Sequence, residues 1–243
     1  MKAIILSAGQ GKRLLPLTLE TPKAALSVRG RRLLEWQLIE IGKTRIKEVV
    51  VITGFGASQI DDIISTHRTT NIKALFNPFF ENCDNLGTCW IAQHEMNEPF
   101  VIINGDTLFE NSILEQLLSS DIERPITLMC DRKPYYDSDD MKIIENKGKI
   151  SRVGKDLPKK KVTGESIGMI RFNEEGIELF KEQMNAIMRQ NDSLKKWYLS
   201  AIDAIAVTGK VGACFIEGYS WCEVDDASDL EIAAKTVQNW NTN

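Results

Sequence analysis

The chain has 243 residues, and its 30 basic and 34 acidic residues give a formal net charge of −4 at pH 7. This length suits one sizeable α/β domain or two small ones, and the acidic balance argues against a general nucleic-acid binder, which usually carries a basic face. No stretch is long and apolar enough to predict a membrane-spanning helix, and the N-terminal apolar run is too short for a secretory signal peptide.

Cysteine and histidine usage adds to these expectations. The five cysteines are odd in number, scattered and outside any C-x-x-C pair, which is typical of reduced thiols in a cytoplasmic protein. The two histidines, His67 and His94, do not have the spacing of metal ligands. We therefore expect a cytoplasmic protein that binds neither nucleic acid nor membrane and has no histidine-rich metal site.

Apolar runs and helical periodicity alternate along the first half of the chain. Strands are predicted at residues 3–6, 49–53, 73–76, 100–103 and 126–130. Helices are predicted at residues 33–41, after an N-cap at Ser58, at 88–96 and at 111–119. Strands that alternate with helices predict a parallel sheet with helices on both faces.

The second half has more strands separated by turns. Strands are predicted at residues 141–144, 149–153, 166–172, 211–216 and 222–224. Helices are predicted after a cap at Asn173, at residues 192–206 and at 227–240. No linker, repeat or low-complexity tract divides the chain, so we expect a single domain over residues 1–243 with a mixed sheet.

The N-terminal stretch, KAIILSAGQGKRLLPLTLETPKAAL at residues 2–26, is where a strand runs directly into a glycine-containing loop. Gly9 and Gly11 have no side chains, so backbone N–H groups can approach an anion closely. Lys12, Arg13 and Lys23 bring cations to the same neighbourhood. The loop lacks the third glycine of a dinucleotide-binding fingerprint and the Gly-Lys-Ser/Thr of a Walker loop.

This stretch resembles the signature of the sugar-phosphate nucleotidylyltransferase superfamily, which reads L-x-A-G-x-G-x-R-L-x-P-L-T followed by P-K. The matching residues here are Leu6, Ala8, Gly9, Gly11, Arg13, Leu14, Pro16, Leu17, Thr18, Pro22 and Lys23. The resemblance implies a Rossmann-like, GT-A-like fold, with a mixed and mostly parallel sheet flanked by helices. It also implies that residues 1–130 bind nucleotide and that 131–243 form a smaller acceptor-side lobe carrying a second metal motif.

The resemblance also implies roles for the loop residues. Those expected to bind the nucleotide are Leu6, Ala8, Gly9, Gly11, Lys12, Arg13 and Lys23. Arg13 and Lys23 are expected to be catalytic as well. The alternative reading is an ordinary βα turn whose basic residues are solvated.

Asp106 follows the predicted strand at residues 100–103, in Asn104-Gly105-Asp106. Ligands of open parallel sheets sit beyond the carboxyl ends of the strands, and Mg²⁺ prefers oxygen ligands and nucleotide phosphates. The superfamily carries a Gly-Asp at this place, so the resemblance implies that Asp106 binds both metal and nucleotide. The alternative is a common Asn-Gly-Asp turn.

A second acidic motif, WCEVDDASDL, occupies residues 221–230. The superfamily often has W-x-D-V-G-T-P-x-x-L here; Glu223 takes the place of its metal-binding aspartate and Asp225 that of its glycine. This departure resembles the E-x-D of the phosphocholine cytidylyltransferase branch, in which both acids act on Mg²⁺. Alternation along a strand would put both on one side. We expect Glu223 and Asp225 to bind the metal and Asp226 or Ser228 to cap the helix that follows. The alternative is an acidic helix N-terminus, in which Asp225, Asp226 and Asp229 suit the helix dipole.

Candidates for nucleobase and acceptor contacts come later in the chain. Asn85 and Thr88 stand where the superfamily reads the base. Lys155 resembles the lysine of its E-K-P motif, which reaches the acceptor phosphate and is expected to be catalytic; the alternative is a surface lysine. Lys142 and Glu165 belong to segments that recur in cytidylyltransferases acting on small phosphates, so both are expected to bind the acceptor.

Trp197 and Tyr198 are further candidates for acceptor binding. Aromatic faces near carboxylates suit an ammonium group through cation–π attraction. In the phosphocholine enzymes that the chain resembles, aromatic residues from this part enclose the choline head. The alternative is that both are core residues.

The resemblance implies transfer of CMP from CTP to a small phosphate or phosphonate, of the phosphocholine or 2-aminoethylphosphonate type, with Mg²⁺ as cofactor and pyrophosphate as product. One alternative is a hexose-1-phosphate uridylyl- or thymidylyltransferase, and another is an inactive regulatory subunit with this fold. The expected partners are CTP or another nucleoside triphosphate and the acceptor, and a homodimer is left open.

Overall fold

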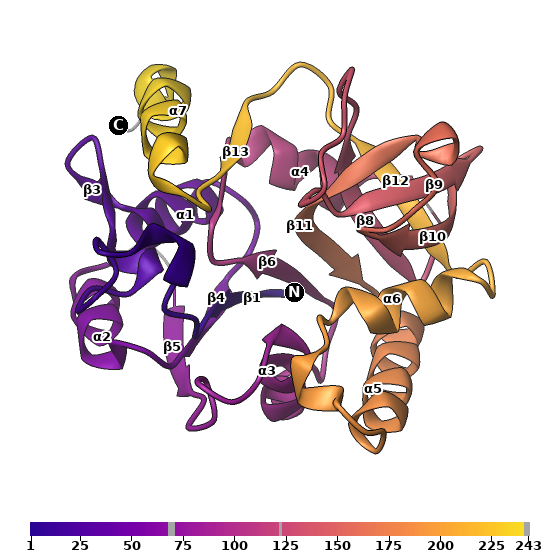
Figure 1. The fold of residues 1–243 in the computed structure, drawn as a ribbon, viewed down its shortest axis with the longest axis horizontal. Helices are drawn as coiled ribbons and strands as arrows, with labels where there is room; N and C mark the ends of the chain where they lie inside the picture. The colour runs from indigo at the N-terminus through magenta and orange to yellow at the C-terminus, as the bar shows by residue number, and fades with distance from the viewer. Residues whose placement is uncertain (68–70, 122, 241–243) are drawn as a thin grey trace. The chain divides into compact units, whose positions relative to one another are not determined.

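Strands and helices alternate along most of the chain in the computed structural model, which describes residues 1–67, 71–121 and 123–240 (Figure 1). The chain contacts define two compact units that interleave along the sequence. The first unit comprises Met1–Glu81, Ile103–Glu115 and Gly218–Asn243, and the second comprises Asn82–Ile102 and Gln116–Glu217.

The first unit is built on a parallel sheet with the strand order β5–β4–β1. These strands are β1 (Lys2–Ser7), β4 (Glu48–Thr53) and β5 (Asn71–Phe76), and all paired neighbours run parallel. Parallel neighbours need a crossover, which α1 (Leu33–Gly42) and α2 (Ala57–Thr66) provide. The arrangement puts the ends of β1 and β4, and the loops that follow them, at one edge of the sheet.

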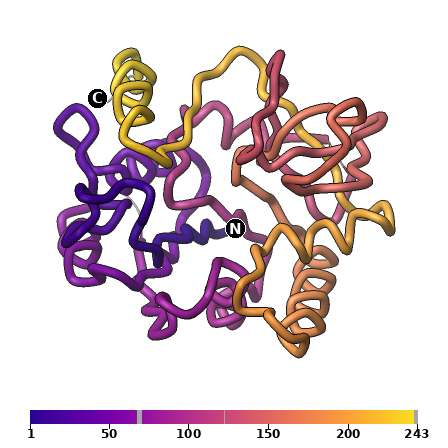
Figure 2. The backbone as a smooth tube through the Cα atoms, in the orientation of Figure 1, coloured from indigo at the N-terminus to yellow at the C-terminus, as the bar shows by residue number. Residues whose placement is uncertain are grey.

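A small antiparallel pair brings distant parts of the sequence together in the first unit. It joins β7 (Thr107–Phe109) to β13 (Trp221–Glu223), with Cys222 opposite Leu108. The helix α7 (Ala227–Thr236) follows β13. Figure 2 shows this C-terminal segment, in yellow, beside the indigo N-terminal segments of the same unit. The pairing therefore carries the second acidic motif to the N-terminal loop.

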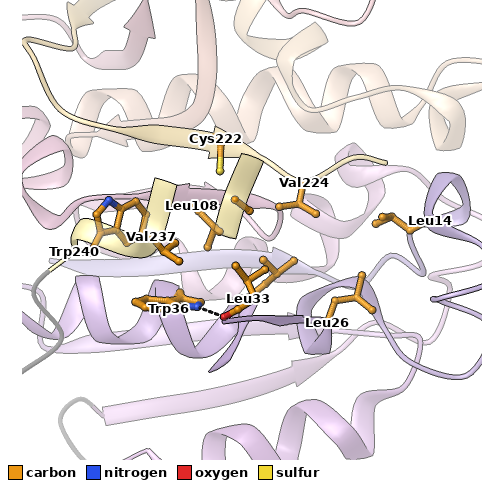
Figure 3. Close-up of a cluster of buried hydrophobic side chains, with 11 residues drawn as sticks. Leu14, Leu26, Leu33, Trp36, Leu108, Cys222, Val224, Val237 and Trp240 are labelled. Carbon is orange, nitrogen blue, oxygen red and sulfur yellow. Dashed lines mark hydrogen bonds between the residues drawn. The ribbon is translucent and has the colours of Figure 1, made fainter. Parts of the chain in front are cut away.

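A buried apolar cluster fixes this contact (Figure 3). Its centre is the edge-to-face pair of Trp36 and Trp240, whose ring centroids lie 5.9 Å apart. Both indole N–H groups are satisfied, because Trp36 donates to the carbonyl of Val28 at 3.0 Å and Trp240 donates to the hydroxyl of Ser220 at 2.8 Å. Burying such large rings with their polar groups paired favours a fixed geometry for the segments that carry them.

The first unit contains one further short pair, β2 (Ser27–Val28) and β3 (Arg31–Arg32). Two elements cross between the units along the chain: β6 (Phe100–Asn104) and α4 (Asn111–Ser119). The 3₁₀ turns of the first unit are Lys12–Leu14, Lys23–Ala25 and Val237–Asn239.

The second unit has the strand order β11–β8–β12–β10–β9. These strands are β8 (Ile126–Asp131), β9 (Lys142–Asn146), β10 (Lys149–Gly154), β11 (Gly164–Phe172) and β12 (Val211–Phe215). β12 runs parallel to β8, whereas the pairs β11–β8, β11–β9, β10–β12 and β10–β9 are antiparallel. Its helices are α3 (Asn85–Ile91), α5 (Glu174–Met188) and α6 (Leu199–Ala206), with 3₁₀ turns at Ala92–Glu95, Lys159–Lys161 and Ser193–Lys195.

The predicted mixed α/β fold is confirmed, with parallel pairing in the first unit and mainly antiparallel pairing in the second. The cap at Asn173 is confirmed too, because its side chain accepts a hydrogen bond from Gly176 N. The single domain stays a prediction. The expected division at residue 130 differs from the two units, since β13 pairs with β7 and so belongs to the first.

Two local predictions were wrong. Ser58 does not cap α2, which begins at Ala57 after Gly56 in a left-handed conformation, with φ of 60°. The helix predicted over residues 192–206 begins only at Leu199, because Lys196 adopts an extended conformation after the 3₁₀ turn. Trp197 and Tyr198 therefore precede the helix instead of lying on it.

Candidate active site

The glycine loop leaves β1 and is held open by backbone and side-chain hydrogen bonds. Gly11 has φ of 81°, a conformation that favours glycine, and a Cβ there would lie 2.9 Å from Lys23 Cβ. Its carbonyl accepts from Thr18 Oγ1 at 2.8 Å and from Leu14 N at 2.9 Å. Leu14 is buried in the apolar cluster, so the turn that carries Lys12 and Arg13 is anchored.

A cavity of about 310 Å³ lies in the first unit beside this loop. The residues that line it are Leu6, Ser7, Gly9, Gly11, Lys12, Arg13, Lys23, Ala24, Gly105, Asp106 and Asp225. The volume is in the range of small-molecule pockets, and the lining mixes backbone, cations and carboxylates. The structure thus brings most of the predicted loop residues, Asp106 and Asp225 to one cavity; Ala8 is buried beside it, and its carbonyl accepts from Phe55 N at 3.0 Å.

Lys23 joins the two carboxylates of this cavity. Its ammonium donates to Asp106 Oδ2 at 2.9 Å and to Asp225 Oδ1 at 2.7 Å, and its side chain is 13% exposed. Arg13 Nη2 lies 2.7 Å from the same oxygen of Asp225. Burial by itself lowers the pKa of Lys23, but the charges and hydrogen bonds of Asp106 and Asp225 outweigh it and raise the pKa above its ordinary value.

The donors at this place fit a hard divalent cation. Among the described residues, Asp106 Oδ1 and Ser7 Oγ are buried oxygens without a hydrogen-bond partner. A buried carboxylate oxygen without a partner is costly, and a cation with oxygen ligands would satisfy it. Asp106 and Asp225 would hold such an ion, since both already lie within hydrogen-bond distance of one positive charge, the Lys23 ammonium.

Glu223 is not among the residues that line the cavity. Within residues 1–67, 71–121 and 123–240, no group of three or more histidine, cysteine, aspartate or glutamate side chains is arranged to hold a metal. β13 ends at Glu223, and Asp225 lies two residues beyond that end; the metal role of Glu223 stays a prediction. Between the two, Val224 N donates to the carbonyl of Asp106 at 3.1 Å, directly beyond the β13–β7 pair.

The remaining acids of the motif cap α7, as the sequence predicted for Asp226. Its side chain accepts from Ser228 N at 2.7 Å and from Asp229 N at 3.3 Å. The carboxylate of Asp229 in turn accepts hydrogen bonds from Asp225 N at 2.7 Å and from Asp226 N at 2.9 Å. Sequence reasoning missed that Asp229 holds the backbone of Asp225; the signal was its position three residues after the cap, where a capping box puts an acid.

Sequence reasoning also missed Ser7, which is among the residues that line the cavity. The signal available was its position as the last residue of β1, immediately before the glycine loop. Hydroxyl groups at that edge of a parallel sheet can contact a ligand beyond the strand ends.

The candidates for acceptor binding lie in the second unit. Glu165 is 3% exposed and lies opposite Lys142 in the β11–β9 pair. Lys133 Nζ lies 3.0 Å from Glu165 Oε2 and 2.8 Å from Asp140 Oδ1. Lys142 is also buried, and its ammonium donates to the carbonyl groups of Lys155 at 2.9 Å and of Asp140 at 3.2 Å.

Lys155 and Trp197 form a second contact in this unit. The Lys155 ammonium lies 4.4 Å from the centroid of the Trp197 ring and 2.9 Å from Asp139 Oδ1. Trp197 is 39% exposed. An aromatic face and a carboxylate here already hold a cation, which is the chemistry expected of an ammonium-binding site.

Three further predicted site residues are buried or hydrogen-bonded to other parts of the protein: Tyr198, Asn85 and Thr88. Tyr198 is 0% exposed, so its ring is part of the core in this structure, and its acceptor-binding role stays a prediction. Its backbone N–H donates to Asn85 Oδ1 at 2.8 Å, which gives Asn85 a role in holding the start of α6. Thr88 is buried in α3, and its hydroxyl donates to the carbonyl of Asp84 at 3.5 Å.

Burial raises the pKa of Glu165 from an ordinary 4.5 to about 7, and Asp140 adds to the rise although Lys133 opposes it. The fold therefore favours the neutral acid, and this stabilisation is present below the ordinary pKa and lost as the pH rises towards 7. We expect Glu165→Gln to gain stability relative to the unmodified protein between about pH 5 and about pH 8. Melting temperatures of both proteins across this pH range measure the difference in stability. A difference that does not change with pH would contradict the raised pKa of Glu165.

A glycine loop with three cations lies beside a carboxylate pair at the end of a parallel sheet. In an α/β protein, this set of groups is suited to binding phosphate and to transfer at phosphorus. Comparison with known families makes the class specific. The family model described as "Nucleotidyl transferase" matches residues 2–239. The chain therefore belongs to the nucleotidyl transferase family of enzymes.

Among the helices of its described residues, none is both long and apolar enough to cross a bilayer.

Several curated relatives match the chain. The bifunctional IPC transferase and DIPP synthase of Aquifex aeolicus is 26% identical over 237 residues, covering 96% of this chain and 51% of that protein. The choline-phosphate cytidylyltransferase of Streptococcus pneumoniae is 31% identical over 120 residues, covering 49% of this chain and 51% of that protein. The chain thus spans about half the length of these two relatives. The CTP:phosphoglutamine cytidylyltransferase of Campylobacter jejuni is 22% identical, with 96% and 98% covered.

Solved structures agree with the fold. The inositol-1-phosphate CTP transferase from T. maritima superposes with a TM-score of 0.81 at 20% identity, covering 99% of this chain and 97% of that one. The CTP:phosphocholine cytidylyltransferase from Streptococcus pneumoniae gives 0.78 at 19% identity, covering 98% and 99%. At these identities the likeness establishes the fold.

Proposed function

We propose that the chain transfers a nucleotidyl group, CMP from CTP, to a small phosphate or phosphonate acceptor and releases pyrophosphate. The observation that carries the proposal is the cavity of the first unit, where the glycine loop and its cations meet Asp106 and Asp225. The choice of CTP is supported by relatives named as cytidylyltransferases. An acceptor phosphate is already ionised near neutral pH, so the reaction needs positioning and charge neutralisation more than a general base.

The chain's own residues divide this work. The backbone of the glycine loop, Lys12 and Arg13 hold the triphosphate and stabilise the charge that develops on the leaving pyrophosphate. Lys23 neutralises Asp106 and Asp225 in the free protein and donates to the α-phosphate when nucleotide is bound. Mg²⁺ held by Asp106 and Asp225 would supply additional positive charge to the phosphate oxygens.

Residues of the second unit select the acceptor. Lys155 is proposed to bind its phosphate or phosphonate. In the structure, Trp197 and Asp139 contact the ammonium group of Lys155, and Asp140 and Glu165 contact that of Lys133. An acceptor that carries an amine, such as phosphocholine or 2-aminoethylphosphonate, would compete for those contacts. Lys142 supports Lys155 by donating to its carbonyl.

The direct test of the proposed function is pyrophosphate release measured with each of the four nucleoside triphosphates against a panel of acceptors, with Mg²⁺ present. We expect turnover with CTP and an amine-bearing phosphate or phosphonate. Turnover with UTP or dTTP and a hexose 1-phosphate would replace the cytidylyl proposal by the hexose-phosphate alternative. Absence of pyrophosphate in every combination would indicate a regulatory subunit without activity.

The acceptor proposal makes a separate prediction. At fixed CTP, we expect phosphocholine or 2-aminoethylphosphonate to outcompete glycerol phosphate, because cation–π attraction contributes roughly 0.5–2 kcal/mol per ring. The variant Trp197→Leu should lose this preference and keep turnover with glycerol phosphate. If acceptors without a cation are preferred by the unmodified protein, the role assigned to Trp197 is wrong, while nucleotidyl transfer is unaffected.

A further inference from the structure

The turn that carries Asp106 is held by a side chain from a helix distant in sequence. Gln37 lies on α1 and is 1% exposed. Its Nε2 donates to the carbonyl of Asn104 at 2.8 Å and to the carbonyl of Thr107 at 2.8 Å. Both partners are acceptors, so only the amide nitrogen of Gln37 can face the turn. One side chain therefore bridges the residues on either side of Gly105-Asp106.

The rest of the turn is fixed by backbone contacts. Gly105 N donates to the carbonyl of Leu6 at 3.1 Å, and the carbonyl of Asp106 accepts from Val224 N at 3.1 Å. A Cβ at Gly105 would lie 2.5 Å from the Leu6 carbonyl oxygen, so the turn packs directly on the end of β1. These bonds hold Gly105 and Asp106 themselves, whereas Gln37 holds both flanks of the turn.

The helix that carries Gln37 is itself well anchored. Figure 3 shows Leu33 and Trp36 of α1 packed in the same apolar cluster as Leu108 and Val224. Leu108 follows the turn of Asp106, and Val224 precedes Asp225. α1 thus contacts both segments that supply a carboxylate to the cavity, and a site supported by a packed helix is held more accurately than one on a free loop.

We propose that Gln37 is a positioning residue for Asp106: its two hydrogen bonds fix the turn so that the carboxylate meets Lys23 and Asp225 in the cavity. The effect on catalysis rests on the proposed function, whereas the effect on the turn does not. Residues that orient metal-binding carboxylates in this way commonly change metal affinity or activity by roughly 10–100-fold when replaced.

The test compares Gln37→Met with Thr44→Val. Methionine keeps the volume and apolar stem of Gln37 and removes both donors. Thr44 is a buried residue of the same unit whose hydroxyl donates to the carbonyl of Ile41 at 2.8 Å, so its replacement removes a buried side-chain hydrogen bond away from the turn. Amide hydrogen exchange of peptides covering residues 103–109 reports on the turn, and Mn²⁺ binding in the presence of CTP, followed by electron paramagnetic resonance, reports on the carboxylates.

We expect Gln37→Met to accelerate exchange at residues 103–109 and to weaken Mn²⁺ binding and kcat by roughly ten-fold or more, with a smaller change in KM for CTP. Thr44→Val should lower the melting temperature and leave exchange at residues 103–109, Mn²⁺ binding, kcat and KM unchanged. If Gln37→Met does not fold, Gln37→Asn, whose amide is one methylene too short to reach both carbonyls, takes its place.

The outcomes separate the two proposals. Equal exchange and equal Mn²⁺ binding in Gln37→Met and the unmodified protein would overturn the positioning role. Equal losses in Gln37→Met and Thr44→Val would also overturn it, because the effect would then follow general destabilisation. An unmodified protein that neither binds Mn²⁺ with CTP nor releases pyrophosphate would refute the proposed function, and the exchange measurement would still decide whether Gln37 holds the turn.

Discussion

Asp106→Asn is expected to lower kcat by on the order of 10³-fold or more while the protein stays folded, which is at the upper end of losses seen when one electrostatic group is removed from a site. The change removes a negative charge without changing side-chain volume. Asp106 contributes a buried oxygen that has no partner among the described residues, and its other oxygen accepts from Lys23 at 2.9 Å. Pyrophosphate release at saturating Mg²⁺ measures the loss, and circular dichroism checks the fold.

Two further variants make this test specific. Asp61→Asn removes an exposed carboxylate from α2 in the same unit and should leave kcat unchanged. Glu223→Gln should lower kcat far less than Asp106→Asn does, because the described residues form no group of three carboxylates that could hold a metal. Normal turnover by a folded Asp106→Asn protein would refute the metal assignment, and an equally large loss in Glu223→Gln would restore the three-ligand site predicted from the sequence.

The N-terminal loop could be predicted from sequence because its information is local. A strand, a loop residue at positive φ and the cations beside it all lie within residues 2–26, and the structure gathers most of them at one cavity. Asn173 as a helix cap is local in the same sense. Both depend on a few neighbouring residues whose preferences agree.

Long-range pairing explains what could not be predicted. The sequence predicted a strand at residues 222–224, whereas β13 spans Trp221–Glu223 and ends opposite Thr107 of β7. The length of that pairing depends on residues more than a hundred positions apart, which no local pattern reports. The surroundings of Tyr198 could not be predicted either, because its complete burial and the hydrogen bond from its backbone N–H to Asn85 come from tertiary contacts.

Lys23→Met is expected to have two opposite effects, because Lys23 neutralises Asp106 and Asp225 in the free protein and is proposed to donate to the α-phosphate during transfer. kcat/KM should fall by on the order of 10²-fold, equivalent to ~3 kcal/mol of transition-state stabilisation. Mn²⁺ without nucleotide should bind more tightly, since the two carboxylates lose the cation that they share.

Lys43→Met is the matched control for this pair of measurements. Lys43 belongs to the same unit, and its ammonium pairs with Glu40 at 2.6 Å, outside the residues that line the cavity. Its replacement removes one positive charge from the unit and should change neither kcat/KM nor Mn²⁺ affinity. A fall in kcat/KM of less than a few-fold in Lys23→Met would remove Lys23 from the transfer step. Unchanged Mn²⁺ affinity in the same variant would show that Lys23 and the metal do not compete for Asp106 and Asp225, and the metal would then have to bind through other oxygens.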